Sequence, residues 1–166
     1  MRKEFDRIVS IDPDVKRSGV AELHVETRML NVTTLDFPAL MDYLQYMKRE
    51  FADKGERLCV VVEAGWMNAS NWHTGNVRSI AAAAKTGQNT GRNHEVARKI
   101  AEMSRHYGLT TEEVNPLKKC WRGTGGKITQ EELEYFLEKK GINGFPKRSN
   151  QDIRDSALLC VIYSKL

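Results

Sequence analysis

The sequence contains only 3 cysteines and 4 prolines among 166 residues, and it has no long hydrophobic run. Cys59, Cys120 and Cys160 are far apart and form no C-x-x-C pair, which argues against a disulfide framework or a zinc knuckle. No stretch reaches the roughly 18 to 20 uncharged apolar residues that a membrane span requires. The first residues also lack the apolar run of a signal peptide, so we expect a cytoplasmic protein with reduced cysteines and no membrane partner.

Internal repeats, low-complexity tracts and linkers are also missing, which indicates a single domain over residues 1–166. Hydrophobic residues make up 40% of the chain and charged residues 29%, as is typical of one soluble globular domain. A chain of this length buries roughly 70% of the surface that it exposes when unfolded. We therefore expect a core that needs neither disulfides nor metal to fold.

Positive charge is concentrated in the middle of the sequence. Residues 76–127 contain ten Lys and Arg against four Asp and Glu, a net charge of +6, whereas the whole chain has a net charge of +4. Such a segment is typical of proteins that bind a polyanion, because Lys and Arg release the counterions condensed on phosphates. A solvated basic surface is the alternative that charge alone leaves open.

Hydrophobic patterns predict an α/β fold that begins with strands. Three strands are expected over residues 7–12, 18–25 and 29–35, and the short polar spacers between them favour an antiparallel meander. Apolar residues at spacings of three and four then predict a helix from Phe37 onward. The continuous β-branched run LCVVVE over residues 58–63 is typical of a central strand buried on both faces. A strand, a crossover helix and a strand imply parallel pairing.

Residues 64–93 are rich in Gly, Asn, Ser, Thr and Ala, and we expect a loop there, broken by a short helix at Val77–Lys85. Four elements are expected to follow, in this order: a helix at Arg92–His106, a strand at Thr110–Asn115, a helix at Thr129–Lys140 and a helix at Asn150–Lys165.

Four carboxylates lie where an α/β fold brings side chains to one edge of its sheet. Asp12 ends the first strand and Glu63 ends the central strand, while Asp152 and Asp155 lie three apart on one face of the last helix. Because like charges repel, such a cluster normally holds divalent metal, and Mg²⁺ prefers oxygen ligands. Two ions activate water and stabilise the leaving oxygen in phosphodiester hydrolysis. Taken singly, each acid has an ordinary structural alternative, such as a turn cap or a favourable helix N-terminus.

Three runs, in the order IVSIDPDVKRSG, VVVEAGWMNASN and NQDIRDSALL, resemble the acidic motifs of RuvC-type Holliday-junction resolvases over nearly the whole chain. These enzymes belong to the ribonuclease H-like superfamily, so the resemblance implies a five-stranded mixed sheet flanked by helices on both faces. It assigns Asp12, Glu63, Asp152 and Asp155 to catalysis with two Mg²⁺ or Mn²⁺ ions. It also implies cleavage of four-way DNA junctions to 5′-phosphate and 3′-hydroxyl ends by a homodimer with the Arg92–His106 helix as its main interface.

The resemblance extends to DNA contacts. Trp66 occupies the position of an aromatic residue that the family aims at the bases of the junction crossover, where stacking on unpaired bases is favourable. GTGGKITQEEL looks like the family's lysine-bearing segment before the penultimate helix, which makes Lys127, and secondly Lys118, candidates for contacting phosphate or stabilising leaving-group charge. Alone, Trp66 also suits a core position and Lys127 a solvated loop. Further DNA-binding candidates come from the same basic region: Arg78, Lys119 and Arg122.

One departure from the family pattern is Asp14, which replaces the usual Gly after I-D-P. It adds an acid near the expected metals and requires a backbone conformation that Asp tolerates. Two alternative functions stay open: an RNA-directed nuclease of the ribonuclease H-like or YqgF-type class, and a catalytically impaired nucleic-acid-binding protein. Branch-migration proteins are candidate partners.

Overall fold

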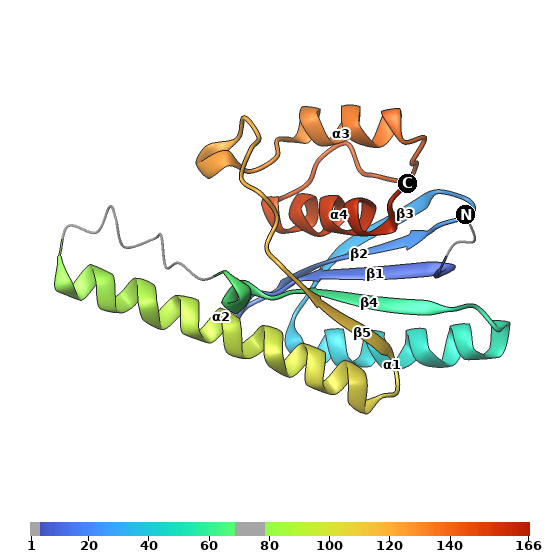
Figure 1. Cartoon of the computed structure of the whole chain (residues 1–166), viewed down its shortest axis with the longest axis horizontal. Coiled ribbons are helices and arrows are strands. Elements are labelled where there is room, and N and C mark those ends of the chain that lie inside the picture. Colours follow the sequence, from blue (N-terminus) through green and yellow to red (C-terminus); the bar gives the residue numbers. More distant parts are fainter. Residues whose placement is uncertain (1–3, 69–78) are drawn as a thin grey trace.

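The computed structural model describes residues 4–68 and 79–166. A five-stranded sheet in the order β3-β2-β1-β4-β5 lies between two layers of helices (Figure 1). β1 pairs antiparallel with β2 and β2 with β3, whereas β4 is parallel to both β1 and β5. The predicted mixed sheet is therefore confirmed. Its strands are β1 (Arg7–Asp12), β2 (Ser18–His24), β3 (Met29–Leu35), β4 (Leu58–Glu63) and β5 (Thr110–Val114).

Helices cover both faces of the sheet, also as predicted (Figure 1). α1 (Phe37–Lys54) and α2 (Ile80–His106) lie on one face, with Leu44 and Ile100 fully buried in the core that they share with the sheet. α4 (Gln151–Ser164) lies on the other face, and α3 (Gln130–Lys139) packs outside α4. None of the helices within residues 4–68 and 79–166 has the length and apolar character that crossing a membrane requires.

The cysteines agree with the expectation of reduced thiols. Cys59 on β4 and Cys160 on α4 are free and fully buried in the core beneath α4, while Cys120 is free and exposed. Burial raises the pKa of the Cys59 thiol to about 11 and that of Cys160 to about 12. Both buried thiols thus stay protonated and act as small apolar side chains.

The prediction for residues 64–93 is wrong in the part that the structure describes. Instead of a loop broken by a short helix at Val77–Lys85, α2 runs without interruption from Ile80, and the Ser79 side chain caps it by accepting a hydrogen bond from the Ala82 amide. The segment up to Arg92 buries almost nothing, and Ile80 is 91% exposed. It therefore has no hydrophobic stripe for a pattern to detect, although its alanines favour a helix. Residues 69–78 lie outside the described residues.

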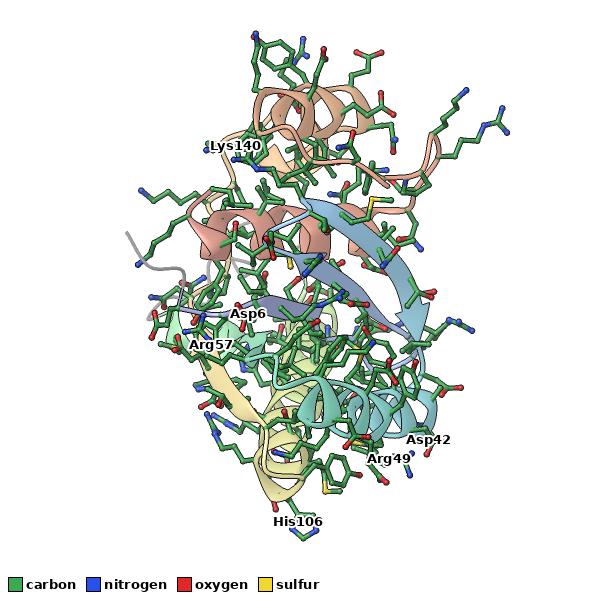
Figure 2. All side chains as sticks on the ribbon, turned by 90° about the vertical axis from the view of Figure 1, so that its right-hand side faces the viewer. Asp6, Asp42, Arg49, Arg57, His106 and Lys140 are labelled. Carbon is green, nitrogen blue, oxygen red and sulfur yellow. The ribbon has the colours of Figure 1, made fainter. Side chains whose placement is uncertain are left out.

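The register of the two central strands determines where the carboxylates lie. Ile11 on β1 is paired with Val62 on β4, so the next residue of each strand, Asp12 and Glu63, ends at the same edge of the sheet. At the opposite end of the two strands, Asp6 directly precedes β1 and Arg57 directly precedes β4. Their side chains form an ion pair of 3.1 Å (Figure 2). In sheets of this kind the carboxyl ends of parallel strands are where ligands bind.

Candidate active site

A pocket of about 370 Å³ opens at the carboxyl ends of β1 and β4. Three of the four predicted carboxylates line it: Asp12, Glu63 and Asp155. Asp152, near the start of α4, is half-buried and does not line this pocket. Most of the remaining lining comes from α2 and from residues 116–128, and its polar or aromatic side chains include Asn93, His94, Lys118, Lys119, Trp121 and Lys127.

Close docking of α4 on the sheet places its acids at this edge. A Cβ atom on Gly19 of β2 would lie 2.1 Å from the Asp152 carbonyl oxygen, so only glycine fits there. One turn further, the buried Ser10 hydroxyl of β1 donates a 2.7 Å hydrogen bond to the Ser156 carbonyl oxygen. β2 therefore contacts α4 before Asp155, and β1 contacts it directly after Asp155.

Burial, and after it the negative charge of neighbouring acids, raises the pKa of three carboxylates. Burial raises the pKa of Asp12 well above its ordinary value, and the negative charges of Glu63 and Asp155 add to the effect. The pKa of Glu63 is also raised, first by burial and then by the charge of Asp155. Burial raises the pKa of Asp152 as well, and Asp14 is the next cause. The pocket thus concentrates negative charge that a bound cation would stabilise.

Lys127 and Gln151 contact the two oxygens of the Asp155 carboxylate. The Lys127 ammonium donates to Oδ2 at 2.9 Å, and the Gln151 amide nitrogen donates to Oδ1 at 2.7 Å. Partial burial alone would lower the pKa of Lys127, but its hydrogen bond and ion pair with Asp155 outweigh burial and raise it. Lys127 is therefore a permanent positive charge in the pocket at neutral pH.

A compact loop carries Lys127. The Gly123 amide donates to the Lys127 carbonyl oxygen at 2.8 Å, and the Trp121 amide donates to the Gly126 carbonyl oxygen at 3.0 Å. Gly126 has a φ of +76°, and a Cβ atom there would lie 2.7 Å from the Lys119 carbonyl oxygen. The glycines of GTGGK therefore let the loop close on itself and direct its lysines into one wall of the pocket.

The acids of this pocket suit a hard divalent cation by their chemistry. Asp12, Glu63 and Asp155 offer only carboxylate oxygens, which are the ligands that Mg²⁺ and Mn²⁺ prefer. Among the described residues, however, no three His, Cys, Asp or Glu side chains form a ready-made metal-binding group. The structure brings the predicted ligands to one end of the sheet, with Lys127 as the counter-charge, and their role as metal ligands stays a prediction.

Trp66 lies in the short 3-10 helix η1 (Gly65–Met67), half-buried against the core beneath α1 and α2. The guanidinium carbon of Arg98 lies 4.8 Å from the centre of the Trp66 ring, and His94 meets the ring edge-on at a centroid distance of 6.2 Å. The indole is thus already packed by α2 side chains and does not line the pocket. Its contact with DNA bases stays a prediction.

The other predicted DNA-binding residues are placed differently from one another. Lys118 and Lys119 are exposed and line the pocket. Arg122 is exposed but pairs with Glu132 at 3.2 Å, which partly neutralises it. Arg78 lies outside the described residues.

Asp14 adopts no strained backbone. Among the described residues other than glycine, only Arg28 and Lys165 have a positive φ. The Asp14 carboxylate instead accepts hydrogen bonds from the amides of Lys16 at 2.8 Å and Arg17 at 3.4 Å, which is an Asx-type turn. The expected demand on the backbone is therefore absent, although the charge of Asp14 still acts on Asp152.

Sequence reasoning missed three pocket residues and one contact. Asn93 and His94 line the pocket from the part of α2 that the sequence already predicts as helical, and Trp121 lines it while packing edge-on against Phe136 at a centroid distance of 6.1 Å. Gln151 was not singled out at all. The predicted helix already contains the first two residues, but no sequence pattern indicates that they face the acids.

The sequence matches no protein-family model and no curated protein. The structure, in contrast, is similar to that of T. thermophilus RuvC in complex with a Holliday junction substrate, with a TM-score of 0.50 and 11% identity, over 96% of this chain and 94% of that chain. A second Thermus thermophilus RuvC structure has a TM-score of 0.50 and 14% identity, over 93% of this chain and 90% of that one. The chain therefore has the RuvC-type, ribonuclease H-like fold that its three acidic motifs predict.

Proposed function

We propose that this protein is a metal-dependent endodeoxyribonuclease of the cytoplasm that resolves four-way DNA junctions by symmetric phosphodiester hydrolysis. The observation that carries the proposal is the convergence of Asp12, Glu63, Asp155 and Lys127 in one pocket at the carboxyl ends of β1 and β4. One structure of the same fold contains RuvC with a Holliday junction substrate, which supports DNA as the substrate class.

In this proposal Asp12, Glu63, Asp152 and Asp155 hold two Mg²⁺ or Mn²⁺ ions. Bound ions of this kind supply activation of water and stabilisation of the leaving oxygen. Lys127 adds a fixed positive charge beside the reacting phosphate and needs no proton transfer to do so. Lys118 and Lys119 hold the flanking phosphates at the mouth of the pocket.

Resolving a junction requires two cuts related by symmetry, so we propose a two-fold homodimer. We place its interface mainly on residues Arg92–His106 of α2, as the sequence predicts. Ala97, Ile100 and Ala101 form the inward stripe of this segment, which leaves its outer face for the partner. A protein that sediments as a monomer while it binds junctions would contradict the dimer but not the pocket chemistry.

A catalytically impaired nucleic-acid-binding protein is the second candidate. The observation that favours it is the lack of a ready-made metal-binding group among the described residues. The acids would then only shape the pocket, and the lysines would carry the binding.

A cleavage assay separates these functions. It offers a labelled mobile four-way junction, a linear duplex of the same sequence and an RNA/DNA hybrid, each with Mg²⁺ or Mn²⁺. Asp12→Asn tests the pocket, and Asp42→Asn is the matched control, because Asp42 is exposed on α1 (Figure 2). We expect paired symmetric nicks on the junction alone from the wild type and Asp42→Asn, and none from Asp12→Asn.

Other outcomes decide against the proposal. Cleavage of the hybrid in preference to the junction assigns the RNA-directed alternative. Tight junction binding without cleavage by any of the three proteins assigns the binding protein.

A further inference from the structure

The two oxygens of the Asp155 carboxylate are engaged by groups of different charge. Oδ1 accepts a hydrogen bond of 2.7 Å from the neutral Gln151 amide, and Oδ2 accepts one of 2.9 Å from the Lys127 ammonium. The Asp155 side chain is only 13% exposed, so neither oxygen is freely hydrated. A divalent cation that binds Asp155 must therefore approach an oxygen that already accepts a hydrogen bond from one of these two partners.

The Gln151 side-chain amide donates two hydrogen bonds. The same amide nitrogen that donates to Asp155 also donates to the Ile128 carbonyl oxygen at 3.2 Å. An amide NH₂ group has two hydrogens, so it can make both bonds at once. Gln151 thus connects Asp155 on α4 to the loop that ends beside Lys127.

The Lys127 side chain, in contrast, is the more easily displaced partner. It lines the pocket and is 43% exposed, against 13% for the Asp155 side chain. Arg154 Nε also donates to the Ile128 carbonyl oxygen at 3.2 Å, so the backbone next to Lys127 is anchored while its side chain is free to turn. A cation that approaches Oδ2 repels the ammonium, whereas it has no such effect on a neutral amide.

We propose that Gln151 is a positioning residue that holds Oδ1 and so presents Oδ2 to a divalent cation, and that Lys127 occupies Oδ2 until that cation binds. This inference rests on the proposed function, because it names how its metal site exchanges partners. On displacement the Lys127 ammonium turns into the pocket, where Lys118 and Lys119 also lie, and meets the substrate phosphate. Metal loading and phosphate binding are thereby linked through one lysine.

The chain contains a matched control for Gln151. Gln130 is likewise the first residue of its helix, α3, and its amide nitrogen also bridges a carboxylate four residues on and a loop carbonyl oxygen. The partners are Glu134 Oε1 at 2.6 Å and the Pro146 carbonyl oxygen at 2.9 Å. None of these residues lines the pocket.

The test is calorimetric titration of Mn²⁺ into the full chain, without nucleic acid, for the wild type and three variants. Gln151→Met keeps the length of the side chain without its donors and should weaken Mn²⁺ binding roughly 10- to 100-fold, the usual loss when a ligand's hydrogen-bond partner is removed. Lys127→Met removes the competing charge and should tighten binding about 5-fold, the equivalent of about 1 kcal/mol for a partly exposed ion pair. Gln130→Met should bind as the wild type does.

The test is decisive because the two pocket variants should change Mn²⁺ affinity in opposite directions. A purely structural role for Gln151 would lower the melting temperature and leave Mn²⁺ affinity unchanged, which would overturn the inference. Weaker binding by Lys127→Met would also overturn it, and this arm stands alone if Gln151→Met does not fold. If the wild type takes up no Mn²⁺, the proposed metal-dependent function itself is wrong. If both pocket variants bind Mn²⁺ as the wild type does, only the proposed exchange of Lys127 for the cation is wrong.

Discussion

Gly19 of β2 lies directly against the backbone of Asp152, so close that a Cβ atom would be 2.1 Å from the Asp152 carbonyl oxygen and 2.5 Å from its carbonyl carbon. The obstacle is backbone, which cannot move aside as a flexible side chain does. Gly19 therefore sets the distance between the sheet and the helix that carries two of the four acids.

Gly19→Ala should push α4 away from the sheet. We expect a loss of about 1–3 kcal/mol in the free energy of unfolding, as for other overpacked sites. Cleavage should fall together with stability, because Asp155 moves relative to Asp12. Urea denaturation provides the measurement. Gly87→Ala is the control: nothing lies within 4 Å of a Cβ atom there, so alanine in this exposed helix should stabilise by about 1 kcal/mol. Equal effects of the two substitutions would contradict this account of Gly19.

Asp12→Asn should stabilise the metal-free protein at high pH. Burial raises the pKa of Asp12 in the folded state well above its ordinary 3.8, so the folded protein binds its proton more tightly than the unfolded chain does. Stability from this group is complete below the ordinary pKa and is lost as the pH rises through the folded pKa. At pH 8 we expect Asp12→Asn to be more stable than the wild type by about 1–3 kcal/mol, the scale of desolvating a buried polar group.

The difference between Asp12→Asn and the wild type should shrink as the pH falls toward 4. Urea unfolding at both pH values, with divalent cations chelated, measures it. Asp42→Asn is the control, because Asp42 is exposed on α1 and lies outside the pocket. A variant that is less stable than the wild type at pH 8 would show that the charge of Asp12 is already compensated without metal.

Two substitutions of Trp66 separate its packing against the core from the predicted stacking of its ring on a DNA base. Trp66→Phe keeps an aromatic ring, whereas Trp66→Leu keeps apolar contact with the core but offers no ring to a base. We expect Trp66→Leu to lower junction cleavage about 10-fold or more, since stacking on one base contributes roughly 1–3 kcal/mol. Affinity for duplex arms should change little, because phosphate contacts supply it. Unchanged junction cleavage by Trp66→Leu would remove the aromatic role.

Lys119 and Arg122 should contribute differently to the salt dependence of DNA binding. Lys119 is exposed and lines the pocket, so Lys119→Met should reduce the slope of log K against log salt by about 1. Arg122 is held by Glu132 through both its side chain and its backbone amide. Arg122→Met should therefore change the slope by clearly less. Fluorescence anisotropy with a labelled junction at several salt concentrations measures both, and an equal loss would show that Glu132 releases Arg122 to DNA.

Most of the sheet was predictable because its signals are local. The β-branched run at residues 58–63 and the polar breaks around residues 18–35 define the strands, and pairing then brings Asp12 and Glu63 to one edge. The first half of α2 was not predictable from hydrophobic pattern, since a helix that buries nothing shows no periodicity. The role proposed for Gln151 could not be predicted from its local bond to Asp155, four residues on, because Gln130 at the start of α3 makes the same bond to Glu134 away from the pocket.

The hydrogen bond between Ser10 and Ser156 joins residues that are 146 positions apart in the sequence. Chains are synthesised and begin to fold from their N-terminus, so Asp12 and Glu63 leave the ribosome long before α4 does. During that interval one face of the sheet has no cover and the acids have no partner from α4. The pocket is complete only when the last helix docks, because α4 supplies Asp155 to its wall, so an unfinished chain, or one cut before α4, lacks part of the acidic site.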